Sequence, residues 1–446
     1  MASDLLSIAA SGARAARGAL DVTAQNIANA SSDGYVRRSL RIAEVAASGG
    51  AGRQADISLS GARIAEIRRN ADPFLQGEVR RTNGDLQRAN TELSGLRNIE
   101  SAIEQSGIFT SIVEFEASLQ QLAGDPSDPS RRAAVLAEAN TMASKFEITA
   151  AGLDSVGAGL RFDADAQLSE ANIIGSELAR VNLRLARAGS GSSDRAALLD
   201  QRDQLLERLA GFSAVTTSFA SDGTVAVSLG SMPARSFVQG GSSGVLSSAQ
   251  AADGTLSFAV DGLATNPGSG SLAGAGLALT SLAATRERLD AMANRLADAV
   301  NAAQAAGVGL DGAPGQPMFS GTGAGDLKVV LASGQGIATA PAGAAAGSRD
   351  TQNLANLRQA LTIENPAQKL SSLLFDVSST VAGRNVTQSA LETIASSARV
   401  SLEQQSSVNL DNEATNLIRF QQAFQASGRA MQVASDIFDT LLGIGR

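Results

Sequence analysis

The fold that we expect for this chain is set by the stretch SVNLDNEATNLIRFQQAFQASGRAMQVASDIFDTLLGIGR, residues 407–446. Its large apolar side chains recur at every seventh position, and a further apolar residue follows the last of them: Leu410, Leu417, Phe424, Met431, Phe438 and Leu441. A repeat of seven places side chains along one narrow seam of an α-helix, as in a coiled coil. The stretch therefore predicts a helix over about 410–442, roughly 50 Å long.

The N-terminal segment shows the same spacing with smaller side chains. Leu6, Ala13, Leu20 and Ile27 lie seven residues apart, and alanines occupy many positions between them. We predict a helix of about 27 residues, roughly 40 Å long. Two such helices at opposite ends of one chain favour packing on each other and on copies of themselves. The alternative is that each is an ordinary surface helix, although average helices have only ~11 to 12 residues.

The N-terminal helix runs into a corner, QNIANASSDGYVRR, residues 25–38. Asn26 and Asn29 lie on one face of the helix, where their amides can cap the helix end or bond neighbouring backbone. Gly34 permits a backbone conformation that a Cβ would disfavour. The Asp-Gly pair is typical of a turn. We therefore predict a sharp turn after the helix, held by asparagine side chains.

The corner also carries residues suited to a contact between subunits. Tyr35 is the only tyrosine of the chain and offers an apolar ring with one polar tip. Arg37, Arg38 and Arg41 form a small basic cluster that we expect to meet carboxylates on an adjacent subunit. The alternative is a plain loop with a half-buried ring.

Composition restricts the chemistry of this chain. It has no Cys, no His and no Trp, so a zinc site of the usual nitrogen and sulfur kind and a nucleophile activated by histidine are both excluded. We find no paired carboxylates in a recognisable setting, and we expect no catalytic residue, no cofactor and no bound metal. A net charge of -8 without a long basic run argues against nucleic acid and an anionic membrane as main partners.

No run of the sequence approaches the ~18 to 20 apolar residues of a membrane-spanning helix. The first twenty residues have Arg14 and Arg17 inside their apolar pattern, so they do not resemble a cleavable signal peptide. The lack of cysteine excludes disulfides but does not fix the compartment.

The middle of the chain changes from a helical period to a period of two and back. Helical patterns cover about 72–106, a segment opened by Asp128-Pro129, and the ranges 164–187, 194–210, 282–303 and 386–404. Between 213 and 274 apolar residues alternate after Asp222-Gly223 and after Asp253-Gly254, which indicates β-hairpins. The range 307–347 is expected to be mostly loops with a short strand at 327–331.

We therefore predict a mainly α fold, with long terminal coiled-coil helices, a helical bundle domain and an inserted small antiparallel β domain. The expected domains are 1–60 with 405–446 as a terminal helical domain, 61–212 with 275–404 as the bundle, and 213–274 as the β insertion.

Two stretches carry a resemblance to a known family. LDVTAQNIANASSDGYVRR, residues 20–38, resembles the N-terminal signature of the flagellar axial proteins, the rod, hook and hook-associated family. The segment 409–443 resembles the closing segment of the same family. Two positions depart from the family pattern: Asp33 stands where the family usually has Pro, and Gln25 where it usually has Asn. The missing proline leaves the corner less rigid.

The resemblance implies a structural protein at the junction of hook and filament, whose terminal helices form the inner layer of a tubular array of its own copies. It also implies contacts with hook protein and hook-associated protein 3, and an extracellular place in the flagellum. Export would use the flagellar type III apparatus and a chaperone, without a cleavable signal. The alternatives are another axial protein, such as hook or distal rod, and a secreted surface spacer. The residues that we assign to the assembly interface are those of the two seams and of the corner.

Overall fold

The computed structural model describes residues 2–44, 61–189 and 191–444, without the side chains of 2–4 and 441–444. The chain divides into two compact units. Unit 1 contains Met1–Gly84, Glu170–Leu246 and Glu392–Arg446, and unit 2 contains Asp85–Ser169 and Ser247–Leu391. Three helices have residues in both units: α2 (Pro73–Glu104), α4 (Pro129–Leu185) and α8 (Pro366–Ser406).

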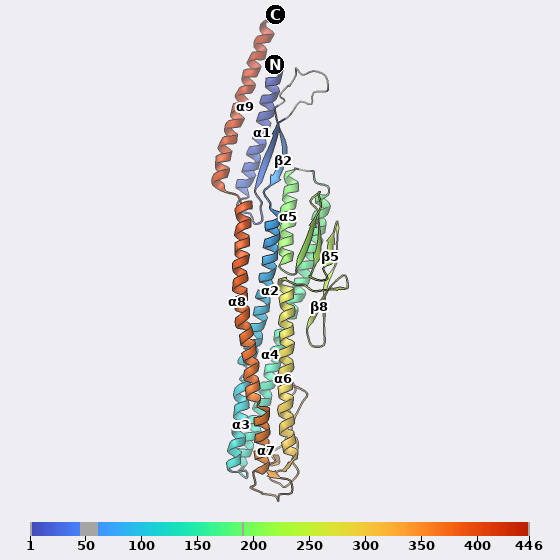
Figure 1. The fold of residues 1–446 in the computed structure, drawn as a ribbon, viewed down its shortest axis with the longest axis vertical. Helices are drawn as coiled ribbons and strands as arrows, with labels where there is room; N and C mark the ends of the chain where they lie inside the picture. The colour runs from blue at the N-terminus through green and yellow to red at the C-terminus, as the bar shows by residue number, and fades with distance from the viewer. Residues whose placement is uncertain (1, 45–60, 190, 445–446) are drawn as a thin grey trace. The chain divides into compact units, whose positions relative to one another are not determined.

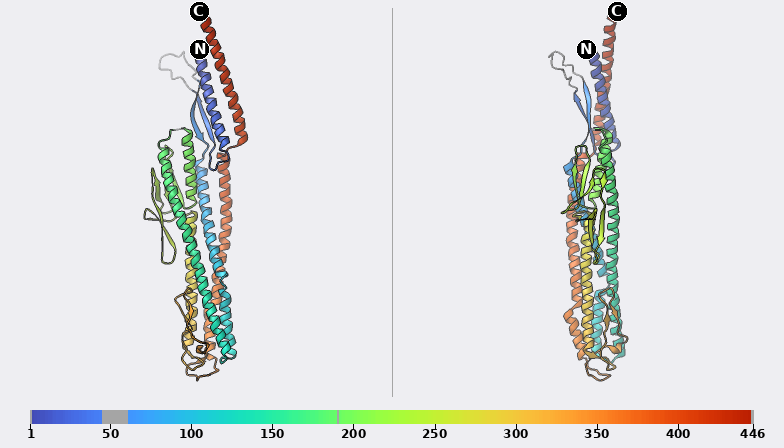
Figure 2. Two further views of the ribbon diagram at one scale, coloured as in Figure 1. Left: turned by 180° about the vertical axis from the view of Figure 1, so that it is seen from behind. Right: turned by 90° about the vertical axis from the view of Figure 1, so that its right-hand side faces the viewer.

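The two terminal helices of unit 1, α1 (Ala2–Ala28) and α9 (Leu410–Ile444), lie side by side and run in opposite directions (Figures 1 and 2). Both helices were predicted from the sequence, and both are confirmed. Small residues let them approach closely, since a Cβ at Gly12 would lie 3.1 Å from the Ser427 Oγ. The antiparallel pair β1 (Arg38–Glu44) and β2 (Ala62–Arg69) also packs on α1, where a Cβ at Gly18 would lie 2.6 Å from Ile64 Cδ1.

Unit 1 also contains α5 (Ser193–Ala210) and an antiparallel sheet. Its strands follow the order β3 (Val215–Phe219), β4 (Val225–Leu229), β5 (Arg235–Gln239) and β6 (Ser242–Ser243). The alternating residues of β4 are buried, as their period of two predicts. The predicted hairpin at Asp222-Gly223 is confirmed, because Gly223 adopts a φ of 83° and the Asp222 carboxylate accepts hydrogen bonds from Thr224.

Unit 2 is a helical bundle. It consists of α3 (Ile108–Gly124), α6 (Gly270–Ala305), α7 (Gln352–Glu364) and its own parts of α2, α4 and α8. Its core combines apolar residues from all of these helices with residues of the segment that follows α6. In that core the Phe115 and Phe319 rings meet edge to face, with their centroids 6.0 Å apart. The predicted helical bundle is confirmed.

Short strands complete unit 2. The sheet order is β7 (Leu246–Gln250), β8 (Leu256–Val260) and β9 (Leu263–Thr265), with Leu246 itself in unit 1. The segment after α6 contains β10 (Gly307–Val308), β11 (Phe319–Ser320), β12 (Lys328–Val329), the 3-10 helix η1 (Gly334–Gly336) and β13 (Ala340–Pro341). The buried Arg132 guanidinium holds this segment by donating to the carbonyls of Gly334 and Ile337. The predicted short strand near 327–331 is confirmed by β12, whereas β10, β11 and β13 were not predicted.

Three details of the secondary structure differ from the prediction. The two helical patterns at 129–156 and 164–187 form one helix, α4, of 57 residues. The helix continues through Gly157, where a Cβ would lie 2.9 Å from Leu282 Cδ2, so the glycine allows close packing at this point. The helices α3 and α7 were missed. The strands of the predicted β insertion lie partly in unit 1 and partly in unit 2, and the three-domain division stays a prediction.

Candidate assembly site

Asn26 organises the corner after α1. Its side chain is only 1% exposed. The Asn26 Nδ2 donates to the Arg38 carbonyl at 2.8 Å, and its Oδ1 accepts from the Arg38 amide at 3.0 Å. The Tyr35 hydroxyl donates to the same Oδ1 at 2.9 Å. One asparagine therefore ties the last turn of α1 to the start of β1, and the predicted bonding of asparagine to neighbouring backbone is confirmed.

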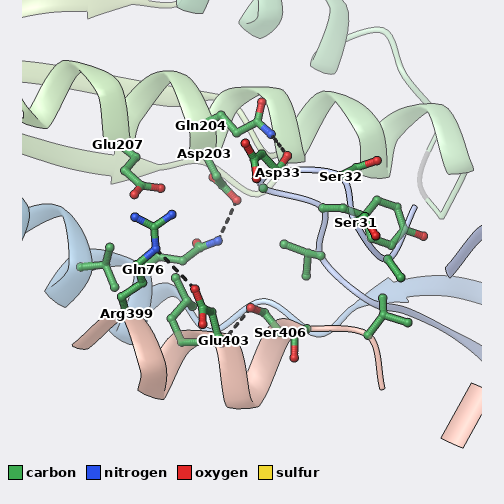
Figure 3. Close-up of a pocket in the computed structure, with 18 of the residues that line it drawn as sticks. Ser31, Ser32, Asp33, Gln76, Asp203, Gln204, Glu207, Arg399, Glu403 and Ser406 are labelled. Carbon is green, nitrogen blue, oxygen red and sulfur yellow. Dashed lines mark hydrogen bonds and ion pairs between the residues drawn. The ribbon is translucent and has the colours of Figure 1, made fainter. Parts of the chain in front are cut away.

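The turn between these elements needs glycine at one position. Gly34 has a φ of 70°, in the left-handed region, and a Cβ there would lie 2.1 Å from the Gln204 Nε2. Gln204 of α5 donates from that nitrogen to the Asp33 carbonyl at 2.5 Å (Figure 3). The corner thus keeps a fixed contact with α5 although Asp33 replaces the usual proline. Asn29 adds a hydrogen bond of 2.8 Å from its Nδ2 to the Gln25 carbonyl in the preceding turn.

A network of charges lies beneath the corner, formed by Arg38, Arg69, Asp200, Arg202 and Asp203. Arg38 and Arg69 pair with the two carboxylate oxygens of Asp200 at 3.1 and 2.7 Å. Arg69 and Arg202 pair with Asp203 at 2.9 and 2.6 Å. All five side chains are mostly buried, so their charges are screened little by solvent.

Burial raises the pKa of two groups in and around this network. It raises the pKa of the Asp200 carboxyl, while the guanidinium groups of Arg69 and Arg38 act in the other direction. Burial also raises the pKa of the Tyr35 hydroxyl, which therefore stays protonated and able to donate to Asn26 near neutral pH. The Arg38 guanidinium lies 5.0 Å from the centre of the Tyr35 ring. Its Nε is buried without a hydrogen-bond partner among the described residues.

Arg37 joins the corner to the start of α9. Its Nε lies 2.7 Å from Glu413 Oε1, and the Glu413 side chain is only 2% exposed. The Arg37 amide donates to the Ser406 carbonyl at 2.9 Å, just before α9 begins. The sequence led us to expect carboxylates of an adjacent subunit opposite these arginines. Within the single chain, Arg37, Arg38 and Arg41 pair with carboxylates of the same chain, and the contact with an adjacent subunit stays a prediction.

The sequence analysis missed Arg69, Asp200, Asp203 and Glu413 as members of this site. A signal was present for α5, where Asp200, Asp203 and Glu207 follow a spacing of three and four that places them on one helical face. Arg38 of β1 and Arg69 of β2, which pair with these acids, are far away in the sequence, and no local pattern connects them. Glu413 of α9 is equally remote from its partner Arg37.

The predicted seams are only partly covered in the single chain. On α1, Ala13 is buried and Leu20 half-buried, whereas Leu6 is 45% and Ile27 37% exposed. On α9, Leu417 and Met431 are half-buried. Three other residues of the α9 seam are exposed: Leu410, Phe424 and Phe438. The Leu441 side chain lies outside the described residues.

The contact between α1 and α9 uses smaller residues than the seams suggested. Ala9, Ala16 and Ala19 of α1 are buried, and Ala434 of α9 is 2% exposed. The exposed large residues of α9 include three more that were not predicted: Ile418, Val433 and Ile437. We name the exposed set Leu410, Ile418, Phe424, Val433, Ile437 and Phe438 the outer α9 face. Large apolar side chains that stay exposed along one helix of a single chain are candidates for an interaction surface. The contact of the seam and corner residues with another subunit stays a prediction.

Other motifs of the chain have structural explanations. In GTGAGDLK, residues 321–328, the amides of Thr322 and Gly323 donate to the Asp326 carboxylate of the same loop. A phosphate would have to displace that carboxylate. Among the described residues, no cluster of three or more acidic side chains has the arrangement of a metal site. None of the described helices has the length and apolar character of a membrane span.

Comparisons with known proteins place these features in a family. Residues 93–319 match the model described as "Flagellar hook-associated protein FlgK helical domain". Residues 6–35 match "Flagella basal body rod protein", and residues 402–444 match "Flagellar basal body rod FlgEFG protein C-terminal".

The chain is similar over its length to the flagellar hook-associated protein 1 of Bacillus subtilis (strain 168), with 26% identity covering 97% of this chain and 96% of that protein. It is 28% identical to that of Salmonella typhimurium and 27% identical to that of Escherichia coli K12, over 71% of this chain. The matched stretch spans 59% of the Salmonella typhimurium protein and 60% of the Escherichia coli protein. A solved structure, the flagellar hook junction protein FlgK from Burkholderia pseudomallei, matches 55% of this chain and 46% of that one, with 25% identity and a TM-score of 0.48.

The paired terminal helices and the matches at both ends define the class, which is that of the axial structural proteins of the bacterial flagellum. Because the FlgK model covers half of the chain, the chain belongs to the flagellar hook-associated protein FlgK family, that of hook-associated protein 1. Its role is structural, at the junction between the flagellar hook and the filament.

Proposed function

We propose that the chain assembles with copies of itself into a tubular ring array on the hook tip, with α1 and α9 as its inner layer. The observation that carries this proposal is the outer α9 face, six large apolar side chains that are 41–56% exposed in the single chain. Fully burying one such side chain stabilises an interface by about 1.5–3 kcal/mol. A neighbouring subunit that covers this face removes the apolar surface from water.

The small residues of α1 and α9 explain how one helix pair can serve as a repeated element. Alanine, glycine and serine hold the two helices together within a chain, which leaves the larger residues of α9 free for contacts outside it. The corner cluster fixes the start of α9 through Arg37 and Glu413. We infer that this cluster sets the position of the outer α9 face before a neighbour binds.

Membership of the family supports an axial position in contact with hook components. We propose that the array rests on the last hook protein subunits below and meets hook-associated protein 3 above. Filament growth then starts from a surface that the hook alone does not provide. No catalytic step is needed for this role, and the family is a structural one.

A family member at this place has to leave the cell before it assembles. We propose export through the flagellar type III apparatus to an extracellular position in the flagellum. An apolar surface such as the outer α9 face favours aggregation in the cytoplasm. We therefore propose that an export chaperone covers α9 before secretion.

Electron microscopy of cells that produce defined variants tests the assembly proposal. The first variant, Phe424→Asp with Phe438→Asp, places two charges on the outer α9 face. The matched control, Gln421→Asp with Gln432→Asp, adds the same charges at exposed polar positions of the same helix. We expect hooks without filaments and filament protein in the medium for the first variant, and normal filaments for the control.

The two alternatives predict other results. Normal filaments from both variants would favour a secreted spacer that needs no apolar contact. A hook or distal rod protein would give a third result, because cells with the first variant would then lack complete hooks rather than filaments alone.

A further inference from the structure

A pocket of unit 1 lies beside the corner and is not explained by the contacts described above. It has a cavity volume of about 370 Å³. Its walls come from the loop 30–36, from α2 and α5, and from the end of α8 with the link that follows it (Figure 3). Ser31, Ser32 and Asp33 are exposed on one side of the pocket, and Arg399 and Glu403 on another, so the pocket opens to solvent.

One wall of this pocket holds a buried cation without a bonded partner. Arg80 of α2 is only 8% exposed. Among the described residues, its guanidinium makes no hydrogen bond and no ion pair. The carboxylates of Asp203 and Glu207 lie near enough to favour its charge, but neither is bonded to it. Burial lowers the pKa of Arg80, while the charges of Asp203 and Glu207 act in the other direction.

The neighbouring acids are largely committed to other partners. Asp203 already pairs with Arg69 and Arg202, and it accepts a hydrogen bond from Gln76. Glu403 accepts from Arg399 at 3.4 Å. Figure 3 shows the Arg399 guanidinium pointing across the pocket toward Glu207. The hydroxyl groups of Ser31, Ser32 and Ser407 add hydrogen-bond donors to the lining.

A guanidinium in a partly enclosed pocket forms a strong charge-assisted pair with a carboxylate that binds it in two places. We propose that the pocket receives the carboxylate of an aspartate or glutamate from a second copy of this chain, which pairs with Arg80. This inference rests on the proposed self-assembly.

Two observations favour a second copy over a free anion as the source of the carboxylate. The pocket adjoins the end of α1 and the start of α9, the segments that match axial proteins at both termini. A neighbour that covers the outer α9 face therefore passes close to it. The chain also carries 44 acidic residues against 36 basic ones, so its surface offers many carboxylates to a neighbour.

The test compares Arg80→Met with Arg81→Met. The first removes the buried charge and keeps an unbranched apolar side chain, and the second removes the exposed neighbouring charge. We measure the thermal midpoint of each monomer and the critical concentration for self-assembly by sedimentation. We expect Arg80→Met to be as stable as the wild type or more so, yet to need at least about tenfold more protein to assemble. Arg81→Met is expected to assemble like the wild type.

Further arms of the experiment separate the other outcomes. The variant Arg80→Lys keeps the charge without the fork of the guanidinium and is expected to recover part of the assembly. If Arg80→Met assembles as the wild type does, the inference is wrong. If sodium acetate raises the thermal midpoint of the wild-type monomer but not of Arg80→Met, while both assemble equally, the pocket binds a free anion and the second copy is ruled out.

The variant Phe424→Asp with Phe438→Asp is measured in the same assay, so that the two proposals fail separately. If this variant assembles normally, the proposed function fails. If it is blocked while Arg80→Met assembles normally, the proposed function stands and only the assignment of the pocket is lost.

Discussion

Replacing Asn26 by alanine is expected to weaken the corner of unit 1 more than any other single polar truncation there. The change leaves three groups without their partner: the amide and carbonyl of Arg38 and the hydroxyl of Tyr35. Each buried polar group left unpaired costs about 1–3 kcal/mol. Because Tyr35 is half-buried and can recover a water molecule, we expect a total loss of about 3–6 kcal/mol in the free energy of unfolding of unit 1.

The assay uses a property of the composition. Tyr35 is the only tyrosine and the chain has no tryptophan, so tyrosine emission during urea unfolding reports on the corner itself. Helical circular dichroism follows the rest of the chain. The emission transition of Asn26→Ala is expected to move to much lower urea than that of the wild type.

Two controls decide how the result is interpreted. Asn29→Ala removes one hydrogen bond to the Gln25 carbonyl, which keeps its backbone partner, and is expected to cost about 0.5–1.5 kcal/mol. Tyr35→Phe, followed by circular dichroism, removes one bond of the three and is expected to cost about 1 kcal/mol. If Asn26→Ala costs no more than Asn29→Ala, our account of the corner is incorrect.

Three further predictions concern the same unit and the β-hairpins. Gly34→Ala is expected to lower the free energy of unfolding in urea by about 1–3 kcal/mol, because alanine is strained at positive φ and its Cβ collides with Gln204. Adding Gln204→Ala should recover the part of the loss that the collision causes. Equal losses with and without Gln204→Ala would contradict this explanation. Glu413→Gln is expected to speed the hydrogen exchange of backbone amides in the first turns of α9, because Arg37 loses its buried anionic partner. Unchanged exchange in these turns would mean that the ion pair does not hold the start of the helix. The pKa of Asp253 is lowered by hydrogen bonds from the hydroxyl and amide of Thr255, so its contribution to stability is fully present above about pH 4 and is lost as the pH falls through the lowered pKa. Asp253→Asn keeps the acceptor oxygen without the charge, and its unfolding free energy should therefore fall less than that of the wild type on acidification; parallel pH curves would refute the assignment.

The elements that the sequence predicted best are those with a long and regular period. The two terminal helices show repeats over four or five heptads, and the β4 strand alternates strictly after Asp222-Gly223. The missed helix α3 had an equally good pattern, with Ile108, Ile112, Phe115, Leu119 and Leu122 all on one face. The sequence analysis assigned no element to this stretch although the pattern was present.

The site was predictable only where it is local. Asn26, Asn29 and Gly34 lie within one turn and helix end, and their backbone roles follow from residue type. The partners of Arg37 and Arg38 are Glu413 and Asp200, which lie 376 and 162 residues away along the chain. Periodicity gives the face of a helix but not the identity of the element that packs on it. For the same reason the sequence was enough to recognise the two seams. It was not enough to predict which residues of the seams stay exposed.

The central claim is that the outer α9 face becomes covered when the protein joins the flagellum. The chain has no cysteine, so a single engineered thiol can be labelled without background. We would compare the maleimide reactivity of Phe424→Cys in the purified monomer and in isolated hooks that carry filaments, with Met232→Cys, at a 94% exposed position of the β4–β5 turn, as reference. Our account predicts that Phe424→Cys reacts in the monomer and is protected in the assembled structure, while Met232→Cys retains more of its reactivity. Equal reactivity of Phe424→Cys in both states would contradict it.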